Sequence, residues 1–421
     1  MNIVRYLIDD CNVDVNAKDN EETIALHDAS LKGHLNIVRY FVQDCHIDVN
    51  TKDNDGWTAL HCASQEGHLD IVQFIIQDCH VDVNTKINDG RTELYIASRK
   101  GHLEIVRFFM QDCQVDVNTR INDGWTALYC ASEEGHLNIV KFYVQACHAD
   151  VNVKSNDGWT ALHSASYRGH LNIVRFFIQD CQVDVNTRTN DGWTALHCAS
   201  EKGHLNIVKY FLEDCCVDVT ATIDNDRWTA LHYASQKWHL DVVRFFKNDC
   251  HLNVHTTTKA GITTLHLASQ EGHSHIVRYF IQYRHVDVAA KIDDGSAALH
   301  LASQNGHLDV VQCFINDCHV DVTTTKDNDG RTALHSASQH GHLNIVQYFV
   351  EVCGVDIGTT TNLGSTACHL ARPNVADYLL QKETRPQSSE KTYWYSYIFN
   401  FKRKGTCTNE GTSSRKKQRQ K

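Results

Sequence analysis

The chain has 421 residues, of which 42% are hydrophobic and 22% charged, and this composition excludes a globally disordered protein. The sequence contains no run of 18 apolar residues, so we expect no membrane-spanning helix. The first ten residues, MNIVRYLIDD, include acids and no apolar segment, which argues against a secretory signal. We therefore expect an intracellular protein whose 17 cysteines are reduced.

Charge divides the chain into two parts. It has 40 basic and 51 acidic residues, a formal net charge of −11. Residues 382–421 contain 11 of the basic and 3 of the acidic residues, so this tail carries +8 and residues 1–381 carry −19. An acidic body with a basic tail bears on partners and cellular address rather than on fold.

A period of 34 residues runs through residues 1–381, and such self-similarity predicts stacked repeats. Two intervals are 35 residues long because one residue is added in a loop. We divide this region into a half-repeat (1–21), ten repeats (22–361) and a degenerate capping repeat (362–381). A leucine marks each repeat, and a cysteine takes its place in the last: Leu26, Leu60, Leu94, Leu128, Leu162, Leu196, Leu231, Leu265, Leu299, Leu334 and Cys368. Because the chain opens inside a second helix, we expect a fragment or a missing upstream part.

Each repeat predicts the same elements in chain order. Thr58 is a suitable N-cap for a short helix over residues 59–66, and Gly67 can adopt the left-handed conformation that ends it. A second helix over residues 69–78 directs its apolar side chains towards a core. Residues 81–90, VDVNTKINDG, predict an extended arm and a tight turn, which form a hairpin loop into the next repeat.

The repeat resembles the ankyrin repeat. The family pattern G-x-T-P-L-H-x-A-A-x-x-G-H is matched by residues 158–170, GWTALHSASYRGH, and near-copies cover residues 1–381. The resemblance implies an all-α repeat solenoid of stacked helix-turn-helix units with β-hairpin loops, followed here by a mostly disordered basic tail. The chain departs from the family in its alanine in place of proline and in one extra residue after the second helix.

Histidine and cysteine recur too regularly to mark one catalytic or metal site. Nine histidines follow the recurrent leucine slot, and in ankyrin repeats this histidine resembles a structural link to the backbone across the turn. Ten cysteines follow the second helix, and without a Cys-x-x-Cys pair they favour buried free thiols over zinc ligands. Phosphate-binding loops and nucleophile elbows are also missing. We expect no enzyme activity, no cofactor, no metal and no nucleic-acid site.

One slot, directly after the turn glycine, is rich in tryptophan and arginine, the residue types enriched in binding hot spots. In the ankyrin family this slot lies at the hairpin tips that edge the concave face. The neighbouring Asp residues make this edge acidic, which suits a Lys- or Arg-rich ligand. Alternatively the indoles form a ladder that stiffens the hairpins. The candidate partner-binding residues are Trp57, Arg91, Trp125, Trp159, Trp193, Trp228 and Arg331.

Regularity is lost near residues 216–240. Arg227 replaces the turn glycine and Trp238 replaces the helix-ending glycine. A left-handed residue with a side chain costs roughly 1–2 kcal/mol, so we expect different local geometry there. Drift within the array and a hinge or binding bend are the two explanations.

The tail contains a polar linker from residue 382, an aromatic segment (392–401) and two basic clusters. The spacing of the clusters resembles a bipartite nuclear-import signal, which an importin-type receptor would bind. A membrane-surface anchor, self-inhibition of the acidic body and a plain solvated end are the alternatives. The predicted import residues are Arg403, Lys404, Arg415, Lys416, Lys417 and Arg419.

We conclude from the sequence that the chain is a non-enzymatic scaffold or adaptor in the nucleus or cytoplasm. It should bind a protein, with a basic peptide or protein as the favoured class, on its concave hairpin and first-helix face. Two alternatives stay open. The chain could be the ankyrin part of a larger channel, enzyme or adaptor, or a scaffold held at a membrane by its tail.

Overall fold

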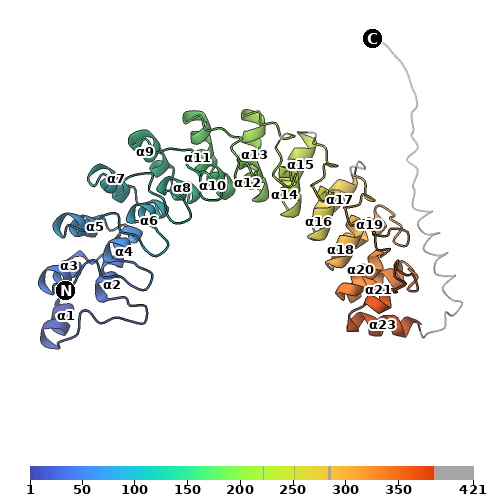
Figure 1. Ribbon diagram of the computed structural model, residues 1–421, viewed down its shortest axis with the longest axis horizontal. Coiled ribbons are helices and arrows are strands. Elements are labelled where there is room, and N and C mark those ends of the chain that lie inside the picture. Colours follow the sequence, from blue (N-terminus) through green and yellow to red (C-terminus); the bar gives the residue numbers. More distant parts are fainter. Residues whose placement is uncertain (221, 251, 283–285, 384–421) are drawn as a thin grey trace, which may run out of the picture. The chain divides into compact units, whose positions relative to one another are not determined.

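The computed structural model describes residues 1–220, 222–250, 252–282 and 286–383 (Figure 1). The chain divides into two compact units, Met1–Asp321 (unit 1) and a second unit that begins at Val322 (unit 2). Regular structure in the described residues is helical, without strands. The predicted β-hairpins are loops that contain at most an isolated bridge, such as that between Arg120 and Thr126.

Unit 1 is a series of helix pairs. It starts with α1 (Asn2–Arg5) and η1 (Tyr6–Asp10), which occupy the place of a second helix. The first helices of the following pairs are α2 (Ala25–Leu31), α4 (Ala59–Glu66), α6 (Glu93–Lys100), α8 (Ala127–Glu133), α10 (Ala161–Arg168), α12 (Ala195–Glu201), α14 (Ala230–Gln236), α16 (Thr264–Gln270) and α18 (Ala298–Gln304). The second helices are α3 (Leu35–Arg39), α5 (Leu69–Gln73), α7 (Leu103–Gln111), α9 (Leu137–Cys147), α11 (Leu171–Arg175), α13 (Leu205–Lys209), α15 (Leu240–Asn248), α17 (Ser274–Gln282) and α19 (Leu308–Asn316).

Several second helices end in a turn of π-helix. These turns are η2 (Tyr40–Asp44), η3 (Phe74–Asp78), η4 (Phe176–Asp180) and η5 (Tyr210–Asp214). Unit 2 contains α20 (Ala333–His340), α21 (Leu343–Gln347), η6 (Tyr348–Val352), α22 (Ala367–Leu370) and α23 (Pro373–Glu383).

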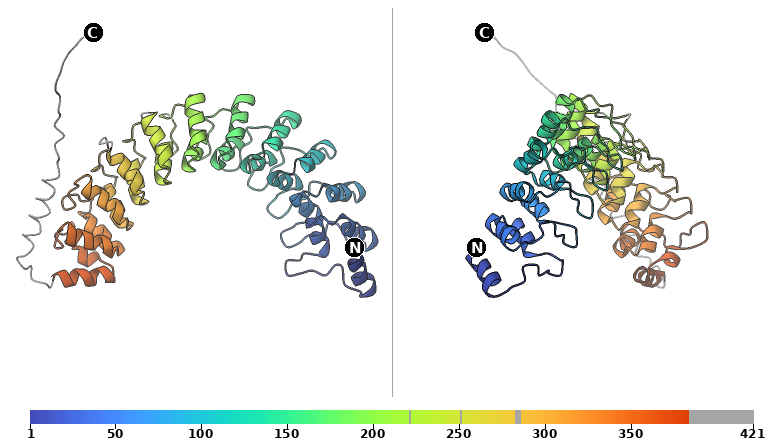
Figure 2. Two further views of the ribbon diagram at one scale, coloured as in Figure 1. Left: turned by 180° about the vertical axis from the view of Figure 1, so that it is seen from behind. Right: turned by 60° about the vertical axis from the view of Figure 1, so that its left-hand side comes forward.

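The helix pairs of unit 1 stack in chain order, which confirms the predicted solenoid. Each first helix contacts the next first helix, and the second helices contact each other in the same order. Figures 1 and 2 show two rows of helices with the hairpin loops on the side of the first helices. We call this the first-helix side. One position of the second helix is a fully buried aromatic side chain in seven repeats of unit 1: Phe109, Tyr143, Phe177, Phe211, Phe246, Phe280 and Phe314.

The ends of the first helices follow the prediction. Thr58 is the extended N-cap of α4, and Gly67 ends α4 with φ 84°. A histidine of the next repeat binds this helix end, because His102 Nε2 lies 2.8 Å from the carbonyl oxygen of Gln65. A Cβ atom on Gly67 would lie 2.6 Å from the His102 ring. Gly67 is therefore required both for its left-handed backbone and for the imidazole packed against it.

The exit of the second helix explains the period of 34. The N–H of Cys45 donates to the carbonyl oxygen of Tyr40, five residues earlier, at 3.0 Å. His46 then turns the chain with φ 57°. The helix predicted over residues 69–78 is present, and its last five residues form a π turn that absorbs one additional residue without breaking the helix. The prediction of buried thiols here was wrong, since Cys45 and Cys79 are half-exposed.

The hairpin loops of successive repeats are joined by an asparagine ladder. Asn88 Nδ2 donates to the carbonyl oxygen of Asn54 at 2.9 Å, and the Asn88 N–H donates to that of Asp55 at 3.0 Å. The same side-chain bond recurs along unit 1 from Asn122, Asn156, Asn190 and Asn225. Each loop is therefore held in register by the loop before it. The arm predicted as extended contains a turn, in which Asp82 accepts from the Asn84 N–H at 2.9 Å.

Candidate partner-binding surface

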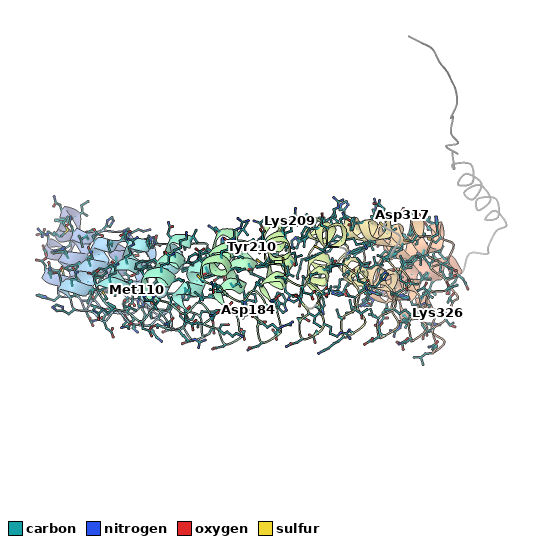
Figure 3. The ribbon with its side chains drawn as sticks, turned by 90° about the horizontal axis from the view of Figure 1, so that it is seen from above. Met110, Asp184, Lys209, Tyr210, Asp317 and Lys326 are labelled. Carbon is teal, nitrogen blue, oxygen red and sulfur yellow. The ribbon has the colours of Figure 1, made fainter. Side chains whose placement is uncertain are left out.

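The seven residues predicted to bind a partner occupy one structural position. All seven are half-buried and precede the N-cap of a first helix. Six of them lie in unit 1, on its first-helix side, and Arg331 lies in unit 2. The second helices present other residues: Figure 3 shows Lys209, an exposed residue of α13, on the side away from the loop residue Asp184. The slot thus contributes one partly exposed side chain per repeat.

Three of the predicted tryptophans belong to an aromatic cluster in unit 1, which we define as Trp159, Tyr167, Trp193, Trp228 and Tyr233. The Trp193 ring centre lies 6.4 Å from that of Trp159 and 4.4 Å from that of Tyr233. The Tyr233 ring centre lies 5.0 Å from that of Trp228. Tyr233 is only 8% exposed, whereas the three indoles keep an open face. One contact of the proposed indole ladder is present, between Trp159 and Trp193, while Trp228 joins the cluster through Tyr233, and the half-exposed indoles leave aromatic surface for a partner.

Buried histidines support this surface from below. His163 Nδ1 accepts from the Thr160 N–H at 3.2 Å, and its Nε2 lies 3.1 Å from the carbonyl oxygen of Thr187 and 3.2 Å from that of Trp193. These contacts confirm the predicted link across the turn. Burial lowers the pKa of His163 to about 4, so the ring is neutral near pH 7. The same holds for His197 and His232.

Carboxylates flank the indoles at the hairpin tips. Asp123, Asp157 and Asp191 are exposed, and the structure shows no ion pair for them among the described residues. The adjacent asparagines are committed to the asparagine ladder, so the carboxylates are the polar groups left for a ligand. An indole beside an unpaired carboxylate suits a cationic side chain.

Two other predicted residues meet at a hollow of about 250 Å³ in unit 1. The Arg91 guanidinium lies 5.8 Å from the centre of the Trp57 ring and pairs through Nε with Asp89 at 2.6 Å. We call the hollow the basic pocket and define it by its lining residues: Trp57, Gln65, Arg91, Ile96, Arg99, Lys100 and Glu134. The sequence indicated Trp57 and Arg91 as single contacts and did not predict that they enclose a pocket.

A buried acid lies in the same repeat as Arg91 and Ile96. Glu93 is fully buried at the start of α6, where most repeats have alanine. Its Oε1 accepts from the Thr85 hydroxyl at 2.5 Å and lies 3.3 Å from His61 Nε2. Burial raises the pKa of Glu93 to about 8 and lowers the pKa of His61 to about 4, so both groups are neutral near pH 7. This pair has no counterpart under the aromatic cluster, where the residue at the start of the helix is alanine.

The different local geometry predicted for the irregular region is not found at the two replaced glycines, because both replacements keep the left-handed backbone of glycines such as Gly56 and Gly67, which have φ 84°. Arg227 and Trp238 both have left-handed backbones, with φ 62° and 67°. The loop after Arg227 has Lys259 in place of the asparagine that elsewhere packs on the turn glycine. Trp238 is 59% exposed and stacks on His273 with ring centres 5.7 Å apart. The hypothesis of a hinge or binding bend stays a prediction.

The tail residues Arg403, Lys404, Arg415, Lys416, Lys417 and Arg419 lie outside the described residues. Within the described ranges, no helix is long and apolar enough to cross a membrane. The same ranges contain no group of three or more His, Cys, Asp or Glu side chains that could hold a metal ion.

Comparison with known proteins identifies the type of these repeats. A family model for ankyrin repeats, three copies long, matches six overlapping segments: residues 1–87, 75–155, 138–223, 181–256, 239–325 and 299–390. A search of curated proteins found no match. Ankyrin repeats generally mediate protein–protein interactions, and proteins built from them are typically non-enzymatic scaffolds. With a matching model over almost all of its described length, and with helix pairs stacked in chain order, this chain belongs to the ankyrin-repeat family.

Proposed function

We propose that this chain is a non-enzymatic scaffold that binds a protein partner on its first-helix side. The observation that carries the proposal is the single slot after the hairpin turn, where six partly exposed Trp and Arg side chains follow one another along unit 1. Residues of these types supply most of the binding energy in protein interfaces. The asparagine ladder and the buried histidines fix the slot in advance, so little entropy is lost on binding.

The aromatic cluster and the carboxylates beside it favour a partner segment that carries Lys or Arg. A basic side chain over Trp159 or Trp193 would gain both cation–π contact and attraction to Asp157 or Asp191. The exposed position of these carboxylates makes the attraction sensitive to salt. A basic segment is therefore the ligand class we propose for this part of the surface.

Charge reversal tests the proposal without disturbing the core. Partners captured by the full chain would be compared with those captured by the double variant Asp157→Lys/Asp191→Lys. The matched control is Asp180→Lys/Asp214→Lys, which changes the same charge at exposed ends of second-helix segments. We expect the first variant to lose the partner and the control to keep it. Loss in the control alone would place binding on the other side of the repeats.

We further propose that the tail directs nuclear import, on the basis of its two basic clusters. A fluorescent fusion of the full chain should accumulate in the nucleus. Replacing Arg403, Lys404, Arg415, Lys416, Lys417 and Arg419 by alanine should return it to the cytoplasm. Unchanged nuclear accumulation of the variant would contradict this proposal, and its recruitment to membranes in place of the nucleus would favour a lipid anchor.

A further inference from the structure

The basic pocket exists because one repeat lacks a ring that another has. In the aromatic cluster, Tyr233 of one repeat fills the space beside Trp193 of the repeat before it. The residue equivalent to Tyr233 beside Trp57 is Ile96, which is smaller and only 3% exposed. The Trp57 ring and Ile96 therefore border open volume. The pocket thus has an apolar floor and one aromatic wall.

Its charge is opposite to that of the unpaired carboxylates beside the aromatic cluster, Asp157 and Asp191. Three basic side chains, Arg91, Arg99 and Lys100, line it together with one acid, Glu134. Arg99 and Lys100 are the one doubly basic pair at this position among the repeats of the sequence. Counting Asp89, which pairs with Arg91, the site keeps an excess of one positive charge.

The basic groups retain unused donors. Arg91 and Arg99 each use Nε for their ion pair, with Asp89 at 2.6 Å and with Glu134 at 3.2 Å. In the part of the chain that the structure describes, Lys100 makes no ion pair, and no hydrogen bond is formed by the terminal guanidinium nitrogens of the two arginines. A guanidinium that is held through one nitrogen is oriented and can still bind a second carboxylate.

We propose that the basic pocket binds an aspartate or glutamate side chain of the partner, with an apolar residue of the same extended segment against Ile96 and the Trp57 ring. A monoanion fits the single excess positive charge better than a dianionic phosphate does. The chain's own tail is an unsuitable occupant, because residues 382–421 carry +8 and would meet charge of the same sign. This inference rests on the proposed function and adds the partner's chemistry at one site. The partner then needs a basic segment over the aromatic cluster and an acidic residue at the pocket.

Synthetic peptides test the pocket on the full chain. A fluorescein-labelled peptide of alternating Glu and Leu would be titrated by fluorescence anisotropy at low salt. Matched peptides carry Gln, Lys or phosphoserine in place of Glu. We expect the Glu peptide to bind at least about tenfold more tightly than the Gln peptide, as one charge-assisted hydrogen bond requires. Equal binding of the two would overturn the proposal, and tighter binding of the phosphoserine peptide would reassign the pocket to phosphate.

Variants locate the binding. Lys100→Ala and Arg99→Gln should each weaken the Glu peptide about tenfold. Arg331→Gln is the matched control, because Arg331 occupies the same slot as Arg91 and also pairs with an aspartate, Asp329, at 3.2 Å. We expect no change for this control. An equal loss in all three variants would mean general charge attraction and would refute a site at the pocket.

The outcomes separate this inference from the proposed function. If the Glu peptide fails to bind while Asp157→Lys/Asp191→Lys still abolishes partner capture, the pocket assignment is wrong and the first-helix side stays the binding surface. If the pocket variants and the double variant both leave capture unchanged, the proposed function itself is wrong.

Discussion

The basic pocket and the aromatic cluster are made from the same repeat and differ in how their tryptophans are used. In the cluster, Trp193 contacts rings of both neighbouring repeats, Trp159 and Tyr233. In the pocket, Trp57 has a guanidinium on one side and open volume above Ile96. One residue in the following repeat therefore decides whether an indole stiffens the array or is available to a ligand.

Lowering the pH should produce the largest difference in stability between the two regions. His163, His197 and His232 lie under the cluster with pKa values lowered to about 4, while the unfolded value is about 6.5. Between these values the unfolded chain binds more protons, so stability falls as pH falls. The expected loss from pH 7 to pH 5 is about 2 kcal/mol for each histidine that unfolds. At the pocket the pKa of His61 is lowered in the same way, but the equivalent slots of the next two repeats hold Tyr95 and Tyr129, which do not titrate in this range.

Hydrogen exchange, corrected for the pH dependence of intrinsic rates, would measure this difference repeat by repeat. We expect amides of α10, α12 and α14 to lose protection at pH 5 before those of α6 and α8. Replacing His197 by glutamine should flatten the response of its own repeat. Uniform loss of protection across all five helices would show that the histidines do not set the acid response.

Truncating the two tryptophans should give the next largest effect. Trp193→Ala removes a ring that is packed between two others, and we expect a loss of about 2–3 kcal/mol in the free energy of unfolding. Trp57 already borders the open volume of the pocket, so Trp57→Ala should lower the free energy of unfolding by only about 1 kcal/mol. Urea unfolding followed by circular dichroism compares them. Equal losses would mean that Trp57 is as structural as Trp193.

Glu93 makes the stability of its repeat depend on pH with the opposite sign. Its pKa is raised to about 8 in the fold and lies near 4.5 in the unfolded chain. Between these values the folded state holds more protons, so this group stabilises the fold as pH falls and destabilises it as pH rises. Glu93→Gln keeps the shape without the titration, and we expect it to stabilise the chain by about 1–2 kcal/mol at pH 8 and by less at pH 5.

His61 is the titratable group that faces Glu93, and its lowered pKa acts in the opposite direction below pH 6.5. The Glu93 effect is therefore best measured between pH 6.5 and 8. Urea unfolding at these two pH values suffices. If Glu93→Gln shifts stability equally at both, the carboxyl does not titrate in the fold and the pair is an ion pair.

The exposed ion pairs should matter least. Arg99 pairs with Glu134 at 3.2 Å and Arg168 with Glu133 at 2.6 Å, so α8 is bridged to the repeats on both sides. We expect Arg168→Gln to cost about 0.5 kcal/mol and less in high salt. Arg99→Gln should be similar in stability, although it impairs the pocket. A cost above about 2 kcal/mol would show that these pairs hold the stack together.

The repeating pattern predicts the fold well because each residue type recurs where its physics is needed. Thr58 and Gly67 could be assigned as helix ends from their types alone, and both are confirmed. The asparagine ladder was missed, although the recurrence of asparagine at the turn was a usable signal. The π turn was missed because an extra residue does not reveal whether a helix or a loop absorbs it.

The pocket was beyond sequence analysis for a different reason. Trp57 and Arg91 were selected for residue type, but the hollow depends on the size of Ile96 compared with Tyr233. Nothing in a single repeat reveals this difference, since the two contacts span successive repeats. The sequence predicted an acidic edge, which describes the hairpins as a whole. At the pocket Arg99 and Lys100 make the surface basic, and the sequence prediction did not include this local difference.

In each repeat a histidine binds the end of the first helix of the repeat before it, so the two ends of the array are not equivalent. Removing repeats from the carboxyl side takes away the histidine that binds the last remaining first helix, whereas removal from the amino side leaves every remaining histidine contact in place. The last repeat uses a different contact: Arg372 lies against Gly341 where earlier glycines meet a histidine ring, and Asn374 Nδ2 donates to the Gly341 carbonyl oxygen at 3.1 Å. Engineers who shorten this protein from its carboxyl side should therefore transplant that Arg-Pro-Asn segment as a terminator.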